Sequence, residues 1–486
     1  MVRALWFARV VAVGLIAGPL GATPEPRDTP ALTLEEKEII PEGGRVLVGT
    51  FRVPENRETR EGRTLELEIM LLPATGDDPQ PDPVIYLAGG PGQNAAQLWG
   101  GYRHSWMRED RDILFVSQRG TGGNNRLTCE LDGEAGADDH PDDLQRYLDP
   151  GFNPDAVREC LDRLSRAFDL RWYTTPVAMD DLDELCGLLG YEQVNLLGGS
   201  YGTRAALVFM RRHPDRVRSA ILNGVAPIAF TNPLFHAEEA QAALDRIIDE
   251  CAADPRCAEA FPDLRDKFEA TLARLEAAPA RVTVTHPDTG VEVEVTLTRE
   301  GFAEAFRVLM YYDSRSIPVL IERAHRGEFA YFAQRGIESN RGLRDSLAFG
   351  MLLCVTCAED IPRIDRERID ELTRDTFMGD GRVRRQIAIC DLWPRGVVPD
   401  DYGEPVAVDT PTLIISGRLD PVTGPRWGDE TARHLPNALH VVAPGSHGVG
   451  GACIESITRA FLERASVEEL DISCVESMRE GPFVMP

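Results

Sequence analysis

Short, continuous apolar runs bounded by polar or turn residues recur along this chain and limit the folds open to it. They span residues 84–87, 113–116, 194–197, 220–222, 412–415 and 439–442. Strands that are buried on both faces have this pattern, which is typical of a parallel sheet covered by helices. Two earlier runs, 45–53 and 64–72, alternate apolar and polar residues and indicate an antiparallel pair. We therefore predict an α/β fold with a mostly parallel sheet flanked by helices.

The middle of the chain has a different pattern, with helical periodicity between residues 228 and 405. Residues 237–251 and 261–277 show it most clearly, and a β-rich stretch follows at 281–298. A chain of 486 residues has room for about three domains of ordinary size. We predict one α/β core, residues 30–227 and 406–486, into which a mainly helical cap, 228–405, is inserted.

The N-terminus has the features of an export signal. Arg3 and Arg9 precede an apolar run over residues 10–20, and Gly21 and Ala22 offer small residues for cleavage. The run is too short to span a bilayer as a helix, and an uncleaved membrane anchor is the alternative. We predict a signal peptide over residues 1–22, a periplasmic or secreted protein, and no stable membrane association after signal removal.

The chain contains ten cysteines, which fits an oxidising compartment. Three pairs bracket local segments and are expected to form disulfides: Cys251 with Cys257, Cys129 with Cys160, and Cys453 with Cys474 near the C-terminus. Cys357 pairs with Cys390 in a fourth predicted bridge, with Cys354 as a rival partner. Cys186 lies on an apolar helical stripe and is expected to be a buried thiol. A zinc site at Cys354 and Cys357 is the alternative, but no second ligand pair follows.

The charge balance restricts the partners. The chain has 52 basic and 79 acidic residues, a net charge of −27, and a pI near 4.8. Such a chain repels polyanions, so we predict no nucleic-acid partner. The sequence leaves the oligomeric state open.

A Gly-x-Ser-x-Gly motif, Gly198 to Gly202, separates the apolar run at 194–197 from a helical stretch at 204–212. A serine on a sharp turn between strand and helix needs flanking glycines because side chains would clash there. The helix N-terminus then faces a developing oxyanion. Ser200 is therefore the predicted nucleophile, and a bland glycine-rich turn is the alternative.

A nucleophilic serine needs a base and an orienting acid, which follow a nucleophile elbow in the order Ser, Asp, His. Asp420 comes directly after the run at 412–415, and His447 comes after the run at 439–442. We predict that Asp420 orients His447 and that His447 is the base. Asp409 precedes its strand and is the weaker acid candidate.

A glycine-rich loop follows the run at 84–87. Backbone N–H groups can approach a substrate carbonyl closely there, so Gly89 or Gly90 and Tyr201 are predicted to form the oxyanion hole. After the next run, Arg119 is expected to brace this loop by hydrogen bonding.

These motifs together resemble the prolyl iminopeptidase and tripeptidyl aminopeptidase family of α/β-hydrolase serine peptidases. The resemblance rests on the Gly-Gly-Pro-Gly, Gln-Arg-Gly-Thr-Gly and Gly-Gly-Ser-Tyr-Gly-Thr segments at 89–92, 118–122 and 198–203, with the late Asp and His. Many members have His where this chain has Ala88 and Asp where it has Ser117. The resemblance implies an exported serine aminopeptidase without metal or organic cofactor, acting on peptide N-termini.

Related aminopeptidases bind the substrate ammonium through acidic residues of the cap, and a buried ammonium must be paired. The candidates here are Glu238 and Glu239, in the first predicted cap helix, and Glu359 and Asp360, just after Cys357. An esterase or amidase for small molecules is the alternative, because the same triad serves either substrate class. An inactive binding protein on the same scaffold is a further alternative.

Overall fold

The computed structural model describes residues 31–40, 44–129, 144–150 and 153–486. Residues 32–486 form one compact unit. The predicted signal peptide, residues 1–22, lies outside the described residues. In the described part of the chain, no helix is both long and apolar enough to cross a membrane.

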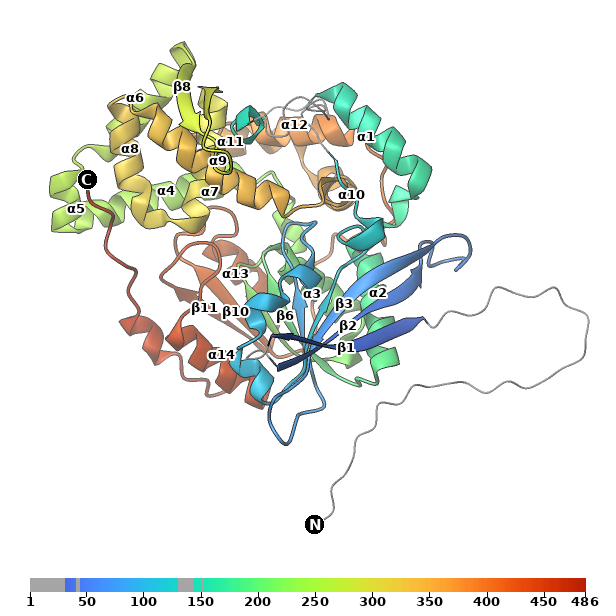
Figure 1. Cartoon of the computed structure of the whole chain (residues 1–486). Helices are drawn as coiled ribbons and strands as arrows, with labels where there is room; N and C mark the ends of the chain where they lie inside the picture. The colour runs from blue at the N-terminus through green and yellow to red at the C-terminus, as the bar shows by residue number, and fades with distance from the viewer. Residues whose placement is uncertain (1–30, 41–43, 130–143, 151–152) are drawn as a thin grey trace, which may run out of the picture. The chain divides into compact units, whose positions relative to one another are not determined.

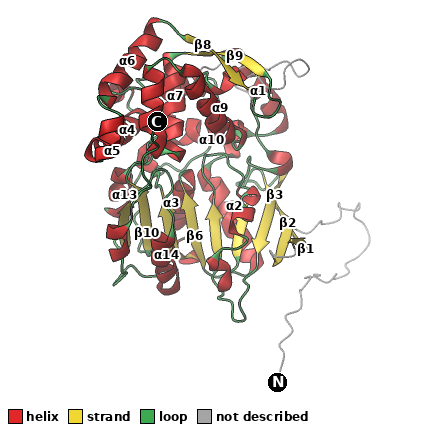
Figure 2. Ribbon diagram, turned by 60° about the vertical axis from the view of Figure 1, so that its left-hand side comes forward, coloured by secondary structure: helices red, strands yellow, loops and turns green. Residues whose placement is uncertain are grey.

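A nine-stranded sheet forms the base of this unit (Figures 1 and 2), in the order β1-β2-β3-β5-β4-β6-β7-β10-β11. The first three strands pair antiparallel and β3 is antiparallel to β5, whereas the other neighbours are parallel. The strands are β1 (Leu32–Ile40), β2 (Gly44–Pro54), β3 (Thr64–Leu72), β4 (Val84–Leu87), β5 (Ile113–Val116), β6 (Val194–Gly199), β7 (Val217–Asn223), β10 (Thr412–Gly417) and β11 (Ala438–Ala443).

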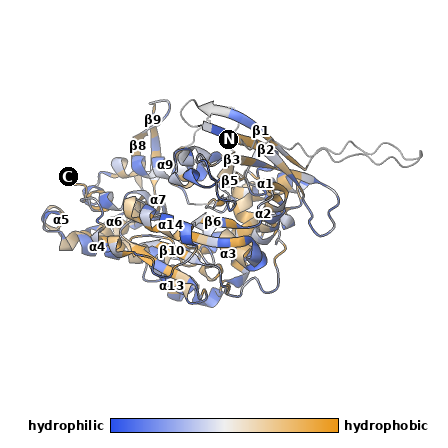
Figure 3. Cartoon of the chain, turned by 90° about the horizontal axis from the view of Figure 1, so that it is seen from below, coloured by the Kyte–Doolittle hydropathy of each residue, from blue (hydrophilic) through white to orange (hydrophobic). Residues whose placement is uncertain are grey.

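The predicted apolar runs become these strands because both faces of the sheet are covered. All residues of β5 and β10 are buried. The covering helices mix hydrophilic and hydrophobic residues, as expected for elements with one exposed and one buried face (Figure 3). They are α2 (Thr175–Leu189), α3 (Tyr201–Arg212), α13 (Pro425–Ala432) and α14 (Ala452–Arg464), whereas α1 (Pro154–Ala167) lies beyond the end of the sheet, above β3 in Figure 1.

Between β7 and β10 the chain is mainly helical, and these helices lie over one end of the sheet (Figure 2). They are α4 (His236–Ala253), α5 (Pro255–Ala260), α6 (Leu264–Ala277), α7 (Arg299–Tyr312), α8 (Ile317–His325), α9 (Phe329–Asp345), α10 (Phe349–Glu359), α11 (Ile369–Thr373) and α12 (Gly381–Cys390), with the hairpin β8 (Ala280–Thr285) and β9 (Glu292–Leu297). We call this segment the cap; its boundaries at 228 and 405 stay a prediction.

The cap has an aromatic core of its own. The Phe302 ring stacks on Phe332 with centroids 4.2 Å apart, and Phe268 lies 4.8 Å from Phe306. These rings come from α6, α7 and α9, so they hold helices together that would be only marginally stable alone.

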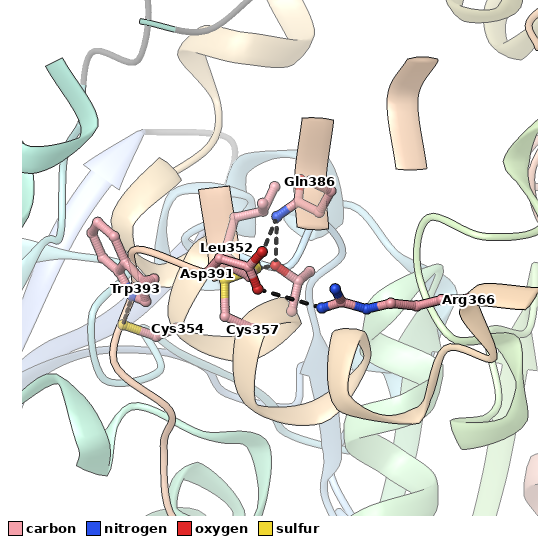
Figure 4. Close-up of a disulfide and its surroundings, with 9 residues drawn as sticks. Leu352, Cys354, Cys357, Arg366, Gln386, Asp391 and Trp393 are labelled. Carbon is pink, nitrogen blue, oxygen red and sulfur yellow. Dashed lines mark hydrogen bonds and ion pairs between the residues drawn. A yellow bond between two sulfur atoms is a disulfide. The ribbon is translucent and has the colours of Figure 1, made fainter. Parts of the chain in front are cut away.

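The disulfides confirm the predicted pairing, including that of Cys357 with Cys390. Cys354 is not the partner. In Figure 4 its sulfur lies beside Trp393, and it accepts a hydrogen bond from Trp393 Nε1 at 3.5 Å. Cys186 and Cys354 are the two free thiols, and both are buried. The zinc alternative is excluded because Cys357 is bonded to Cys390.

Candidate active site

Ser200 lies on the sharp turn between β6 and α3, with φ 53° and ψ −125°, a conformation that non-glycine residues rarely adopt. The flanking glycines are required by space. A Cβ on Gly198 would lie 2.6 Å from the Gly202 carbonyl oxygen, and a Cβ on Gly202 would lie 1.9 Å from that of Leu87. The segment therefore has the geometry of a nucleophile elbow.

Asp420 and His447 come together beyond the carboxyl ends of β10 and β11. Asp420 Oδ2 lies 2.9 Å from His447 Nδ1 and accepts a hydrogen bond from Thr423 Oγ1 at 2.8 Å. Its Oδ1 accepts from the amides of Val422 and Thr423, both at 2.9 Å. Burial opposes ionisation of Asp420, but the charge of His447 and these hydrogen bonds hold its pKa below the usual value. A carboxylate here is ionised and ready to orient an imidazole, whereas the rival Asp409 is exposed.

Ser200 and His447 line the same cavity, which has a volume of about 430 Å³. No hydrogen bond joins them within the described part of the chain, as is common for catalytic pairs before substrate binds. Asn223, at the end of β7, ties their two loops together. Its carbonyl oxygen accepts from the Ser200 amide at 3.1 Å, and its side chain exchanges hydrogen bonds with the Val449 backbone at 2.7 and 3.1 Å.

The predicted oxyanion donors lie beside Ser200. Tyr201 is the first residue of α3, so its amide has no acceptor within the helix. The Gly89 amide donates instead to Gln93 Oε1 at 3.1 Å. Among the described residues nothing accepts from the Gly90 amide. The arrangement favours Tyr201 and Gly90 over Gly89 as the pair of donors.

The expectation that Arg119 braces the glycine-rich loop is wrong. Its fully buried guanidinium donates to both Asp181 oxygens, at 2.7 and 2.8 Å, and to backbone carbonyls that include that of Glu55. A buried cation needs a carboxylate partner, and α2 supplies Asp181. Gln93 supports the loop instead, through its contact with Gly89.

The cap carboxylates predicted to hold a substrate ammonium lie outside this cavity. Glu238 and Glu239 both pair with Arg426, Glu238 Oε1 at 2.8 Å from its Nη1. Glu359 is fully buried and accepts from the Thr175 amide and hydroxyl at 2.6 and 2.8 Å.

Asp360 is also fully buried, and it binds Arg204 Nη1 at 2.8 and 3.0 Å. The sequence prediction placed these four near the substrate because they are acidic and in the cap. Packing has given each of them a partner within the protein, so the structure does not bring them to Ser200.

Other cap residues complete the cavity, and the sequence prediction missed them. His236 begins α4, Arg307 and Tyr311 are on α7, and Arg382 is on α12. The Tyr311 ring packs edge-on against His447, with centroids 4.5 Å apart. No sequence motif marks these positions, since they are ordinary helix residues that meet only through the packing of the cap.

Another set of Ser, His and Asp side chains, joined by hydrogen bonds, lies at β10 and β11. His440 Nε2 is 2.9 Å from Ser416 Oγ, and His440 Nδ1 is 2.8 Å from Asp429 Oδ1. Ser416 has no exposed surface. A substrate cannot reach this serine, so hydrogen-bond geometry alone does not identify an active site.

Comparison with known proteins places the chain in a family. Residues 82–449 match the model of the alpha/beta hydrolase fold. The chain belongs to this family. The predicted fold class is thereby confirmed, and the match spans β4 through the loop that carries His447.

Individual relatives of this α/β hydrolase are distant. It is 25% identical over 489 residues to the serine protease Hip1 of Mycobacterium tuberculosis, covering 89% of this chain and 88% of the relative. It is 22% identical over 336 residues to the putative hydrolase YuaR of Escherichia coli, covering 64% and 62%. A solved proline iminopeptidase from Mycobacterium smegmatis is 17% identical with a TM-score of 0.38, covering 86% of this chain and 98% of that one.

Among the residues that the structure describes, no group of three or more His, Cys, Asp or Glu side chains is arranged to bind a metal ion.

Proposed function

We propose that this α/β hydrolase cleaves peptide, amide or ester bonds through an acyl-enzyme on Ser200. The observation that carries the proposal is that the elbow serine and His447, which is hydrogen-bonded to the buried Asp420, line one cavity. The serine hydroxyl adds to the substrate carbonyl carbon while its proton passes to His447 Nε2. The amides of Tyr201 and Gly90 stabilise the negative oxygen that forms.

The second half of the reaction restores the enzyme. His447 gives its proton to the departing amine or alcohol, which leaves the acyl group on Ser200. Water then loses a proton to His447 and attacks the acyl carbon. As the bond between the acyl carbon and Ser200 Oγ breaks, His447 returns that proton to Ser200 Oγ, which releases the acid and the free serine. Asp420 stays ionised throughout and keeps the imidazole oriented.

An exported aminopeptidase is the first candidate for the specificity. The resemblance of the motifs and the similarity to a serine protease over 89% of this chain support it. Such an enzyme needs an anionic group near Ser200 to pair with the substrate ammonium. Among the residues that the structure describes, no aspartate or glutamate lines the cavity.

An esterase or amidase for small molecules is therefore the second candidate, and the lining of the cavity favours it. One comparison separates the two: hydrolysis of the same peptide amides with a free and with an acetylated N-terminus. A free amine that raises kcat/KM at least tenfold supports the aminopeptidase. Equal rates support the esterase or amidase, and loss of all turnover in Ser200→Ala is required in both cases.

A further inference from the structure

The cap contributes cations to the wall of the catalytic cavity that the reaction of the triad does not use. Arg307, Arg382 and Arg204 line the cavity, and the charge of Arg204 is matched by the fully buried Asp360. Arg307 and Arg382 have no such match, since both contact a single carboxylate, Glu304 Oε2, at 3.4 and 3.2 Å.

Glu304 faces away from the catalytic cavity. It lines a neighbouring cavity of about 200 Å³, and Arg307 and Arg382 line both. Arg385 also approaches Glu304, at 3.5 Å, although its shorter ion pair is with Glu300 at 2.7 Å. The wall between the two cavities therefore carries more positive than negative charge on its Ser200 side.

Several donors on this wall have no acceptor among the described residues. Arg307 has a side chain that is 4% exposed, and its Nε is buried without a hydrogen-bond partner. Arg382 uses Nε for His236 Nδ1 at 2.9 Å and Nη1 for Glu304, and no acceptor in the described structure contacts its Nη2. Buried donors normally have partners, so the unpaired Arg307 Nε in the wall of this cavity indicates a missing ligand. The Arg382 side chain is 36% exposed, so its Nη2 is accessible to the same ligand.

His236 adds a neutral donor to the same wall. Because a guanidinium can only donate, His236 Nδ1 accepts from Arg382 and the ring proton lies on Nε2. Burial, together with the charges of Arg382, Arg307 and His447, lowers the pKa of His236 well below its usual value, so the ring is neutral. Its Nε2–H has no acceptor in the described part of the chain, and the residue lines the cavity.

Resting on the proposed hydrolase function, we infer that the substrate carries a carboxylate near the scissile bond, and that Arg382, Arg307 and His236 bind it. A carboxylate can accept several hydrogen bonds, here from Arg382 Nη2, Arg307 Nε and His236 Nε2, and bonds between charged groups are stronger than those between neutral groups. The same wall disfavours a substrate ammonium, which would meet two guanidinium groups with no carboxylate of its own.

Two matched ester pairs test the inference. One pair is the mono-4-nitrophenyl ester of glutaric acid and its methyl ester, which places the carboxylate on the acyl side. The other is an acetylated depsipeptide with a free or an amidated C-terminus, which places the carboxylate on the leaving side. The rate with Ser200→Ala protein is subtracted as the background.

The readout is the ratio of kcat/KM for the charged ester over that for the neutral ester, so a general loss of activity cancels. We expect this ratio to exceed 10 in the wild type for one of the two pairs, since hydrogen bonds to a charged group contribute about 10- to 100-fold. Arg382→Gln should reduce the ratio by about the same factor, and Arg382→Lys should keep part of it.

Arg384→Gln is the matched control, because Arg384 is on the same helix but pairs with Asp370 and Asp380 and has a side chain that is 53% exposed. This variant should have the wild-type ratio. A wild-type ratio of 1 or less for both pairs overturns the inference, as does an unchanged ratio in Arg382→Gln. Hydrolysis of neutral esters that depends on Ser200 would leave the proposed function standing in either case.

A binding measurement does not depend on turnover. Monomethyl glutarate should raise the melting temperature of the Ser200→Ala protein, and dimethyl glutarate should raise it less. Adding Arg382→Gln should remove the difference between the two compounds. Equal shifts by the two compounds in both proteins would exclude a carboxylate on the acyl side, and together with a depsipeptide ratio of 1 or less they would overturn the inference.

Discussion

At the scale of single residues, burial decides which polar groups can do chemistry. Asp420 and Ser416 are both fully buried, and each is hydrogen-bonded to a histidine, Asp420 to His447 and Ser416 to His440. Of the two histidines, His447 lines the same cavity as the accessible Ser200, whereas His440 contacts the buried Ser416. The roles proposed for Ser200, His447 and Asp420 depend on this access as much as on their hydrogen bonds.

Replacement of either Ser200 or His447 should abolish turnover. We expect Ser200→Ala and His447→Ala each to lower kcat/KM by about 10³- to 10⁶-fold, because triad members act as a unit. Asp420→Asn should cost about 10⁴-fold through the wrong imidazole tautomer. Ester hydrolysis and fluorophosphonate labelling measure these effects, with Ser416→Ala as a control that should keep its label on Ser200. Near-normal rates in His447→Ala would mean that another base is used.

His236 should make the protein less stable in acid. Its pKa is lowered in the folded state by burial and by nearby cations, so below about pH 6.5 the unfolded chain binds a proton that the folded chain does not. The contribution of neutral His236 to the free energy of unfolding is therefore fully present above this pH and is lost as the pH drops below it. His236→Gln, which can still accept from Arg382, should reduce the loss between pH 7.5 and 5.5 in urea unfolding. An identical pH dependence in the variant would refute this account.

At the scale of elements, the active site is assembled from the ends of parallel strands and the starts of helices. The turn after β6 holds Ser200, and β10 and β11 bring Asp420 and His447 to the same edge. The elbow requires close contact between the backbone at Gly202 and the end of β4, because a Cβ on Gly202 would overlap the Leu87 carbonyl oxygen.

Replacing Gly202 by alanine should therefore prevent normal folding of the elbow. The new Cβ would lie 1.9 Å from the Leu87 carbonyl oxygen, and backbone cannot yield by that much. Gly199→Ala is the matched control, because the nearest atom to its Cβ, the Tyr86 hydroxyl oxygen, is 3.9 Å away. We expect a melting temperature near the wild-type value for Gly199→Ala and a large loss or insoluble protein for Gly202→Ala. Similar melting temperatures would show that the strand can shift.

At the scale of the whole molecule, covalent links and the aromatic core of the cap support a large unit. The four disulfides close loops in the sheet layer and the cap, from Cys129–Cys160 to Cys453–Cys474. Such links persist in oxidising compartments, which agrees with the predicted export.

The thiol content should therefore differ between native and unfolded protein. Purified without reductant, the chain should show about two reactive thiols in denaturant, those of Cys186 and Cys354, and none when folded. Burial raises the pKa of each thiol to about 12, which suppresses the thiolate in the folded state. Ellman titration in both states measures this. Four or more thiols in denaturant would mean that a predicted disulfide is absent.

Export should leave a mature chain that begins near Thr23. The predicted signal run is short and follows two arginines, which is typical of cleaved signals. Intact-mass analysis of protein from the host's periplasm or medium tests the prediction. Recovery of full-length chain in a membrane fraction would favour the uncleaved anchor instead.

Much of the fold could be read from the sequence because the responsible interactions are local. Buried strands require unbroken apolar runs, and the Ser200 turn requires glycine at 198 and 202, so both leave a pattern in neighbouring residues. Asp420 and His447 could be located for the same reason, since each follows directly on such a run. The disulfide partners that bracket single loops were also predictable.

The character of the catalytic cavity was decided only by tertiary packing. His236, Arg307 and Arg382 come from α4, α7 and α12, which are far apart in the chain and meet through the cap. The predicted acidic residues met other partners, such as Arg426 and Arg204, because a buried charge is stable only when paired. Which charges pair and which face the substrate depends on how helices dock, and no local pattern in the sequence encodes that.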